Sequence, residues 1–559
     1  MSKKKRIVIL SAVLFIGFVG FQIFGQSEEV AKSPLIATLI KAEVPRVNIK
    51  FPPINKFIAD GVNPIPHGEP AQQDSTPIPG PLDKSRALQE DEILYQHLGP
   101  GHFGAFTSSL YPDGRRVLWS SGVNGVFKLD DETYEILAHI PSDYAAEYTQ
   151  EWAEKITAKL DQNNGQTALW QSIKAIMPLR DLSAVYTVVG SNGWFYIANK
   201  DGTIRAYGDA VDGDASSEIV EKAVFKMPAE AAGPSVGMNV TFDGWIILPT
   251  EMGYLVAVSQ DLSDYRIIQL KHLPDEDMES QGVGYGWVRN SLAIDEEGGV
   301  YVASRNHMHK VVWKNQTFST DEKDGAWVAA YRNGTGAGTG ATPSLMGFED
   351  EDRFVVITDG DERMNVTLFW RDEIPQDWQR LPHAPSRRIA AMAPVTMGDL
   401  NVAKIQSEQT VVVSGYGALV VNNRPRNIPF YMPENGFSHG FLIGPLGSNP
   451  RFQPFGVQKF HWDPTDRNLY TSWVNEEVSS PNGVPWVSAG TNQVYFIGAR
   501  NNQWTLEALD WYTGDETFHY VIGGQKYNSE YSGVTLDENG RVFYGTIWGR
   551  AKLLPKVTE

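Results

Sequence analysis

The sequence predicts an all-β fold, a β-propeller of eight blades, with seven as the alternative count. An N-terminal transmembrane helix and a small helical insertion complete the expected architecture. The chain has 559 residues, enough for one large repeat domain, and a strand–turn–strand pattern recurs along most of it. It is also rich in aromatic residues and turn formers, with 25 Phe, 22 Tyr, 16 Trp, 52 Gly and 33 Pro. Such a composition favours sheets joined by many turns.

A basic cluster and an apolar run open the chain. Residues 3–6 are all Lys or Arg, and they precede the mostly apolar segment Ile7–Phe24. Its length approaches that of a bilayer core, and the basic cluster should remain in the cytoplasm. We expect residues 1–25 to be a membrane anchor or uncleaved signal, with a cleaved signal peptide as the alternative. The protein would then lie in a bacterial inner membrane as a single-pass protein, with its C-terminal domain in the periplasm.

The rest of the chain divides by composition. Residues 26–90 are rich in Pro and lack periodicity, which predicts an extended stalk with polyproline character. Residues 91–559 are assigned to the propeller. A helical insertion is expected at 144–178, where apolar residues such as Trp152 and Ile156 recur every four residues.

The repeat is an Asp-Gly or Asn-Gly turn, a strand of alternating apolar residues, a polar turn and a second strand. Eight such units are recognised, and their strands start near Arg115, Trp194, Trp245, Gly299, Arg353, Thr410, Asn468 and Arg541. The five central intervals span 51 to 58 residues, a period typical of propeller blades. The last unit lacks a strand, which residues 92–98 could supply, closing the ring without exposed sheet edges.

Charge and cysteine content exclude some functions. The formal net charge of −19 opposes binding to nucleic acid. The chain has no Cys, so thiol nucleophiles and thiolate metal sites are excluded. We predict no Ser-His-Asp arrangement.

Two units suggest a family resemblance. FKLDDETYEILAHI from residue 127 and LEALDWYTGDETFHYVIG from residue 506 resemble the blade ends of quinoprotein-like propellers. The strand–turn–strand units also resemble those of gluconolactonase and strictosidine-synthase-like propellers. Quinoprotein dehydrogenases have a disulfide over the cofactor and a docking repeat in most blades. This chain has no Cys and only two approximate copies of the repeat. Both differences argue against pyrroloquinoline quinone as its cofactor.

The resemblance to calcium-dependent hydrolytic propellers implies a cation site around the central channel. Such propellers place Glu, Asp and Asn residues there, and this sequence has suitable residues in its predicted turns. Calcium prefers carboxylate, amide and carbonyl oxygens. The predicted metal ligands are Glu251, Asn306, Asp359 and Asn475. Each of them could instead be an ordinary turn residue.

Other polar residues are candidates for chemistry and for ligand binding. Arg305 and His307, in the sequence RNHMH, are predicted to act in catalysis with Asp359, because His307 and His309 would share one side of a strand. The Gly-rich stretch 333–347 could approach a ligand closely. The predicted ligand-binding residues are Gly338, Gly340, Thr342, Tyr285, Trp287 and Arg289, of which the last three alternate on one strand face.

Two functions remain open. The first is a membrane-anchored periplasmic enzyme, a divalent-cation-dependent hydrolase resembling a lactonase, which acts on a small organic molecule. The second is a non-catalytic binding or assembly module that holds a periplasmic protein partner at the inner membrane. A quinoprotein-like oxidoreductase is a further alternative, although the absence of Cys, and so of the disulfide typical of that family, opposes it.

Overall fold

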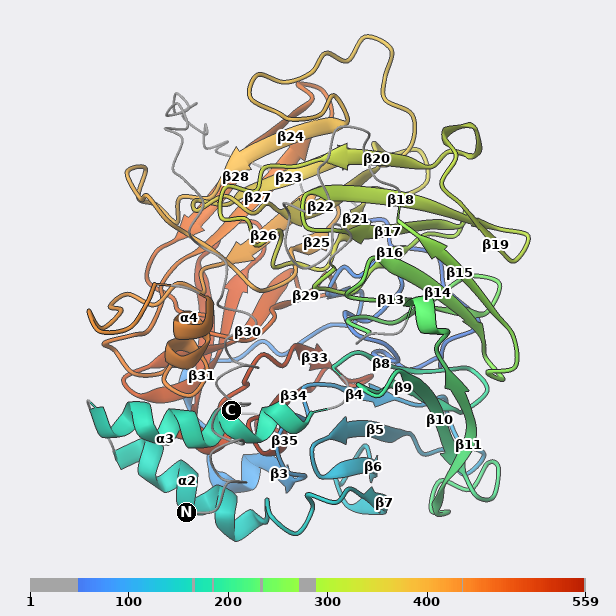
Figure 1. Ribbon diagram of the computed structural model, residues 1–559. Helices are drawn as coiled ribbons and strands as arrows, with labels where there is room; N and C mark the ends of the chain where they lie inside the picture. Colours follow the sequence, from blue (N-terminus) through green and yellow to red (C-terminus); the bar gives the residue numbers. More distant parts are fainter. Residues whose placement is uncertain are drawn as a thin grey trace, which may run out of the picture.

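A computed structural model describes residues 49–162, 166–182, 185–231, 235–270, 288–434 and 436–556. This part of the chain is mostly β, and its strands form eight sheets, most of them four-stranded and antiparallel (Figure 1). The predicted anchor at residues 7–24 lies outside the described residues. Among the residues that are described, no helix is both long and apolar enough to cross a membrane.

Successive strands of the chain are neighbours within each sheet. The first four sheets are β4 (Ala105–Thr107), β5 (Val117–Gly122), β6 (Gly125–Asp130) and β7 (Ile136–Pro141); β8 (Thr187–Val189), β9 (Phe195–Ala198), β10 (Thr203–Asp209) and β11 (Ile219–Lys226); β12 (Asn239–Val240), β13 (Trp245–Pro249), β14 (Tyr254–Ser259) and β15 (Tyr265–Gln269); and β16 (Ala293–Ile294), β17 (Gly299–Ala303), β18 (His307–Lys314) and β19 (Thr317–Ser319), with β20 (Trp327–Ala330) paired to β18.

The other four sheets include two that take strands from the N-terminal part of the chain. They are β21 (Ser344–Met346), β22 (Phe354–Thr358), β23 (Asn365–Trp370) and β24 (Ile389–Pro394); β25 (Val412–Ser414), β26 (Gly417–Val421), β27 (Val457–Asp463) and β28 (Asn468–Asn475); β29 (Trp486–Ser488), β30 (Gln493–Arg500), β31 (Gln503–Asp510) and β32 (Glu516–Gly523), flanked by β1 (Ser75–Thr76) and β2 (Arg86–Ala87); and β33 (Val534–Leu536), β34 (Val542–Thr546), β35 (Gly549–Leu553) and β3 (Ile93–His97).

The first strands of the sheets face a common axis. First strands of neighbouring sheets lie against one another, as in the pairs β4 with β8, β12 with β16, β21 with β25 and β25 with β29. The last sheet is completed by β3, which pairs antiparallel with β35 from Ile93 opposite Leu553 to His97 opposite Gly549. The predicted closure of the ring by the strand at residues 92–98 is therefore confirmed.

Two of the eight predicted repeat units were placed wrongly. The units starting near Thr410 and Asn468 both belong to one sheet, in which Asn468 begins the fourth strand, β28. The sheet made by β29 to β32 was missed as a unit. The turn into its second strand, residues 489–492, reads Ala-Gly-Thr-Asn and contains no Asp-Gly or Asn-Gly pair. Because that turn opens the repeat, the sequence pattern does not reveal this unit.

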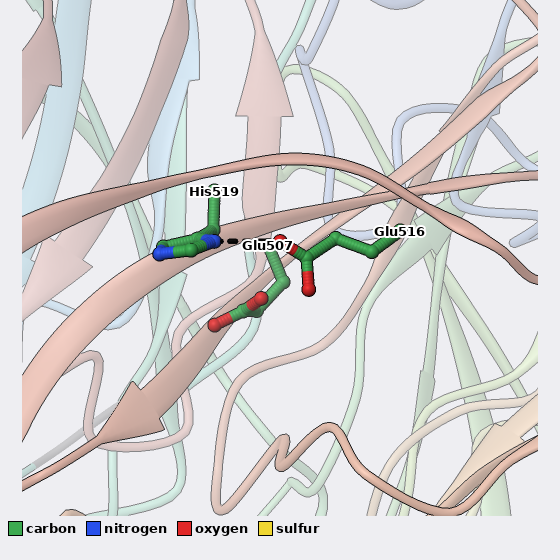
Figure 2. Close-up of side chains that lie close together, drawn as sticks. All are labelled: Glu507, Glu516 and His519. Carbon is green, nitrogen blue, oxygen red and sulfur yellow. Dashed lines mark hydrogen bonds and ion pairs between the residues drawn. The ribbon is translucent and has the colours of Figure 1, made fainter. Parts of the chain in front are cut away.

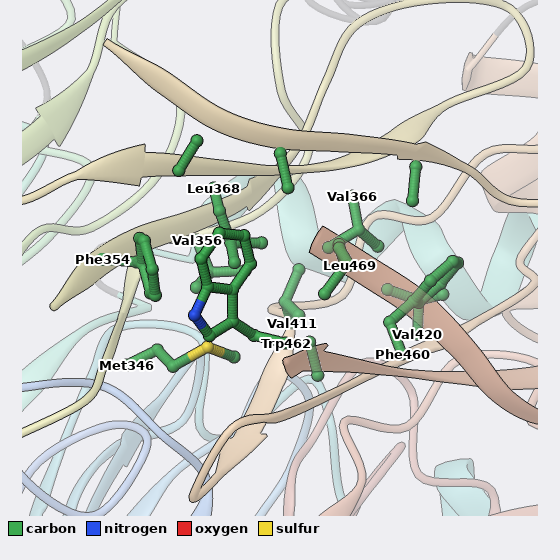
Figure 3. Close-up of a cluster of buried hydrophobic side chains, with 14 of the residues drawn as sticks. Met346, Phe354, Val356, Val366, Leu368, Val411, Val420, Phe460, Trp462 and Leu469 are labelled. Carbon is green, nitrogen blue, oxygen red and sulfur yellow. The ribbon is translucent and has the colours of Figure 1, made fainter. Parts of the chain in front are cut away.

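Hydrophobic cores lie between neighbouring sheets. In β22, Phe354 and Val356 pack with Trp462 of the following sheet, while Val355 and Ile357 pack on the opposite face with Tyr301. The rings of Phe354 and Trp462 are 4.7 Å apart (Figure 3). Both faces of such strands are buried, which explains their uninterrupted apolar runs.

The axial channel is occupied by an N-terminal segment, residues 55–81, which we call the channel segment. It exchanges backbone or side-chain hydrogen bonds with the first strands of seven sheets, β4, β8, β12, β16, β21, β25 and β29. Examples are Ala59 N to Val189 O at 2.9 Å and Ile294 N to Pro70 O at 2.8 Å. The inner edge of each first strand would otherwise present unpaired backbone groups, and the segment satisfies them.

The channel segment enters and leaves at one end of the channel. Near its start, Phe57 O accepts from Ser191 N in the β8–β9 turn, and near its end Gly80 N donates to Ser488 Oγ beside the β29–β30 turn. Its tip, residues 66–74, reaches the opposite end. Residues 26–90 were predicted to be an extended stalk that could lie along the propeller domain, whereas residues 55–81 of this stretch lie inside the ring. Pro fixes an extended backbone, which also suits a chain that pairs with strand edges.

Asn239 fastens the channel segment to the sheets. Its side chain is fully buried, and Nδ2 donates to Pro70 O and to Leu292 O, both at 2.9 Å. We expect Asn239→Ala to lower the free energy of unfolding by about 2 kcal/mol, because two buried hydrogen bonds are lost. Denaturant unfolding would measure this change. The exposed Asn401→Ala is the matched control, and an equal effect of both variants would contradict the role given to Asn239.

In the described part of the chain, three helices lie outside the sheets: α2 (Gln150–Gln162), α3 (Gln166–Ile176) and α4 (Gly436–Ile443). The first two lie within the predicted helical insertion. Ile156 and Leu160 of α2 join Leu442 of α4 and Trp548 in one buried cluster. Short 3-10 turns are η1 (Glu90–Glu92), η2 (Met177–Asp181), η3 (Ala229–Ala231), η4 (Glu322–Asp324) and η5 (Gln525–Tyr527).

Candidate functional site

A cavity of about 190 Å³ lies at the tip of the channel segment. Its wall combines that tip with the residues that lead into the first strands of several sheets. Its lining residues include Pro66, His67, Asp74, Tyr186, Asn290, Gly340, Thr342, Glu408, Gln409, Thr410, Trp486 and Tyr531. The site is therefore built jointly by the channel segment and the ring of sheets.

The part-buried His67 and the buried Asp74 form a pair in this wall. The Nδ1 atom of His67 lies 2.9 Å from Asp74 Oδ2, and Asp74 is only 2% exposed. An ionised Asp74 accepts a hydrogen bond from Nδ1–H, and Nε2 is then free to act as an acceptor. Burial raises the pKa of Asp74, and the neighbouring His67 opposes this rise.

Both residues of the pair have a strained backbone. The φ angles are 62° at His67 and 55° at Asp74, and Gln72 between them has a φ of 61°. Left-handed conformations are costly for residues other than Gly, and they concentrate at functional sites. The Gln72 side chain holds the tip in shape by donating to Pro66 O at 3.0 Å and Glu69 O at 2.9 Å.

The hydroxyl groups of Thr410, Tyr186 and Thr342 lie on this side of the cavity. Thr410 Oγ1 lies 3.4 Å from His67 Nε2, so Asp74, His67 and Thr410 form a continuous chain of polar groups. Tyr186 and Thr342 meet through their hydroxyl groups at 3.2 Å. The ring of Tyr186 lies 6.1 Å from that of His67.

The predicted ligand-binding residues divide into three groups. Gly340 and Thr342 line the cavity. Arg289 is close to it, because its Nη2 pairs at 3.1 Å with Glu408, which does line it. Tyr285 and Trp287 lie outside the described residues. Gly338 belongs to the same loop as Gly340 but does not line the cavity, and a Cβ there would lie 3.0 Å from Arg305 O.

The Gly-rich loop is held by its own hydrogen bonds. Asp361 accepts from Gly334 N at 2.9 Å, Gly360 O accepts from Thr335 N at 3.0 Å, and Asn333 Oδ1 accepts from Gly338 N at 2.8 Å. These three amide groups already have acceptors within the protein. Gly340 is needed for close approach, since a Cβ there would lie 2.6 Å from Ser407 O.

The four predicted metal ligands come from four different sheets, and those with described bonds serve local turns. Asn306 Oδ1 accepts from Asn333 at 2.7 Å, and Asn475 donates to Gly514 O at 2.9 Å. Asn475 is the last residue of β28, a fourth strand, and does not lie in a turn after a second strand. Burial raises the pKa of Glu251, which lies in the β13–β14 turn.

Asp359 and the RNHMH segment lie apart from the cavity wall. Asp359 accepts from Asn365 N at 2.8 Å and from Asn365 Nδ2 at 2.6 Å. Burial, and then Asp361, raise the pKa of Asp359 to about 7. Arg305 Nε donates to Gly336 O at 2.8 Å. His307 and His309 are buried on one side of β18, with ring centroids 6.1 Å apart, and His309 Nε2 lies 2.8 Å from Ser304 Oγ.

Carboxylate and imidazole groups gather at two other places among the described residues. One cluster is Glu507, Glu516 and His519 (Figure 2), and the other is Asp131, Glu132 and Asp537. Arg500 bridges the first, with Nη2 at 2.6 Å from Glu507 and 2.7 Å from Glu516. Lys552 lies 2.9 Å from Asp537 in the second. Arg541 also pairs with Glu132 and Asp537. These cations offset part of the negative charge, so both clusters are explained as ion networks.

Sequence reasoning missed the residues at the centre of this site. His67 and Asp74 were assigned to the stalk, and Thr410 was noted only as the start of a strand. The one signal available was chemical: a His and an Asp seven residues apart in a segment with few other titratable groups.

Comparisons with known proteins agree with this fold. A quinohemoprotein alcohol dehydrogenase from Pseudomonas putida superposes with a TM-score of 0.50 at 12% identity, over 89% of this chain and 81% of that chain. One from Comamonas testosteroni gives a TM-score of 0.49 at 13% identity, over 89% and 82%. No model of a known protein family matches the sequence. The chain is a β-propeller protein that resembles the quinoprotein-like propellers.

A sequence relative defines the family more narrowly. An uncharacterized protein of Archaeoglobus fulgidus is 32% identical over 514 residues, which cover 90% of this chain and 89% of that protein. The chain belongs to the same family as this archaeal protein.

Proposed function

We propose that the protein is an enzyme that hydrolyses a small ester or lactone in the axial cavity, with His67 as general base. The observation that carries this proposal is the His67–Asp74 pair, held in a strained backbone at the wall of the cavity. An imidazole oriented by a carboxylate is an arrangement suited to proton transfer near neutral pH.

The cavity supports a small substrate. Its volume of about 190 Å³ is below that of pockets for drug-sized ligands. Its wall offers hydroxyl groups from Tyr186, Thr342 and Thr410 beside apolar groups such as Trp486. Such a wall can hold a small acyl compound with its carbonyl carbon near His67, which would take a proton from the attacking hydroxyl group.

Hydrolysis of γ-butyrolactone by the full-length chain tests the proposal. Each turnover releases one acid, so a pH-stat measures the rate directly. We expect turnover by the wild-type chain and a loss of about 10²-fold or more in His67→Gln, which keeps the size of the side chain. Absence of turnover with γ-butyrolactone and with a series of small acetate esters would overturn the proposal.

The placement of this enzyme in the cell is a second part of the proposal. We infer that the eight sheets are eight blades and that residues 7–24 anchor them to the inner membrane, with the blades in the periplasm. The basic cluster before an apolar run supports this orientation. Protease treatment of spheroplasts should digest the propeller domain, whereas protection until lysis would contradict the orientation.

Calcium is a separate proposal that derives from the sequence resemblance. Its ligands would include Glu251 and Asp359, oxygen donors of the type calcium prefers. Native mass spectrometry of the full-length chain, before and after chelation, measures a bound ion. A mass excess lost on chelation supports the proposal, and an unchanged mass opposes it.

A further inference from the structure

We propose that Thr410 is the nucleophile of this site and that the reaction passes through an acyl-enzyme. This inference rests on the proposed hydrolase function and names the group that attacks the substrate. Its basis is the chain from Asp74 Oδ2 to His67 Nδ1 at 2.9 Å and from His67 Nε2 to Thr410 Oγ1 at 3.4 Å. A hydroxyl, an imidazole that can take its proton and a carboxylate that orients the imidazole form a nucleophilic triad.

Thr410 is placed by rigid elements around it. It is 5% exposed and lies two residues before β25, whose Val413 donates to Gln73 O of the channel segment at 2.9 Å. The same segment carries His67 and Asp74. Backbone hydrogen bonds between β25 and the channel segment therefore hold Thr410 close to His67, in addition to the contact between their side chains. This favours a fixed attack geometry.

The acylation step balances as follows. His67 Nε2 takes the proton from Thr410 Oγ1, and Oγ1 forms a bond to the acyl carbon of the ester or lactone. The bond between that carbon and the alkoxy oxygen then breaks, and the alkoxide takes the proton from His67. Water repeats the sequence on the acyl-enzyme and releases the acid, which leaves Thr410 as it began.

Gln409 supplies a donor for the developing oxyanion. It is 3% exposed and lines the same cavity, and its Nε2 atom has no acceptor within the described part of the chain. An unpaired buried N–H is costly, and a negatively charged oxygen in the cavity would satisfy it. We assign Gln409 to that role, next to the nucleophile in the sequence.

The experiment combines kinetics with trapping of the intermediate. The full-length chain is mixed with β-butyrolactone, quenched in acid after a few milliseconds, digested and mapped by mass spectrometry. Opening of the lactone by Thr410 leaves both fragments attached, so the peptide containing Thr410 should gain the mass of one lactone. Turnover of γ-butyrolactone is measured in parallel by pH-stat for the variants.

Three substitutions separate nucleophile from scaffold. Thr410→Val keeps the shape without the hydroxyl and should lose about 10³-fold or more in kcat, with no adduct. Thr410→Ser restores a hydroxyl and should retain activity within about tenfold, with the adduct on Ser. Gln409→Leu should lower kcat by about 10²-fold while KM changes little.

The outcomes distinguish this inference from the function on which it rests. Wild-type turnover together with full activity of Thr410→Val, and no adduct, would mean that water attacks directly. That result overturns the role of Thr410 and leaves the hydrolase function intact. If the wild-type chain turns over neither lactones nor esters, the hydrolase function fails, and the acyl-enzyme fails with it.

Discussion

Asp74→Asn is expected to lower kcat for γ-butyrolactone by about 10³-fold, with little change in KM. Asn keeps the size of the side chain but loses the charge that stabilises protonated His67. It can also turn its amide toward His67 Nδ1, and Nε2 would then carry the proton. An imidazole in that tautomer cannot accept a proton from Thr410 Oγ1, which lies 3.4 Å from Nε2.

The measurement needs a control within the same segment. Asp60 belongs to the channel segment, but its side chain is 71% exposed and pairs with Arg116 near the other end of the channel. Asp60→Asn should retain the wild-type kcat. Thermal unfolding of both variants shows whether the channel segment stays in place. A folded Asp74→Asn chain with wild-type kcat would remove the proton relay from the mechanism.

The architecture could be predicted because it depends on local pattern. Apolar runs opened by Asn-Gly or Asp-Gly turns mark strands such as β9 and β13, and the near-constant spacing marks the sheets. The prediction failed where the opening turn lacked that chemistry, at residues 489–492 between β29 and β30. It also failed where β26 and β27 are separated by a long connection that contains α4.

The site could not be predicted because it depends on contacts between distant parts of the chain. His67 and Thr410 are 343 residues apart and meet only because the channel segment turns back inside the ring. A Pro-rich segment without periodicity resembles a linker when it is read alone. The residues chosen from turns, such as Asp359 and Asn475, instead satisfy backbone groups of their own turns.

Gly340 and Thr342 were predicted from the Gly-rich stretch, and both lie in the wall of the cavity. A Gly-rich entry to a first strand indicates crowding, and at Gly340 the crowding comes from Ser407 O, three residues before Thr410. Close approach of these two entries brings the Gly-rich loop and the nucleophile together in one wall. The glycine signal therefore indicated the end of the channel at which the cavity lies, although it did not identify His67, Asp74 or Thr410.

A second carboxyl group lies buried beside the cavity. Glu530 precedes the cavity residue Tyr531, is 1% exposed, and its Oε2 atom has no hydrogen-bond partner among the described residues. The φ angles of Glu530 and Tyr531 are 39° and 66°, both left-handed. Asn528 accepts from Glu530 N at 3.0 Å and donates to Gly444 O at 3.0 Å, which fixes this loop beneath α4. A carboxylate in this position would be charged without compensation.

Burial raises the pKa of Glu530 from 4.5 to about 8. Between these values the unfolded chain releases a proton that the folded chain keeps, so raising the pH favours unfolding. The contribution of Glu530 to stability is fully present below pH 4.5 and falls by about 1.4 kcal/mol per pH unit up to pH 8, a total of roughly 5 kcal/mol.

Glu530→Gln should therefore be more stable than the wild-type chain at pH 9, by several kcal/mol, and similar to it near pH 5. Gln has the shape of the protonated acid and cannot ionise, so this part of the pH dependence disappears. Thermal unfolding of both chains from pH 5 to pH 9 measures the difference, and Glu477→Gln, at an exposed carboxylate, is the matched control. Parallel pH curves for the wild-type and Glu530→Gln chains would show that Glu530 is already ionised in the folded protein. The loop beneath α4 would then have to stabilise a buried charge that its described contacts do not compensate.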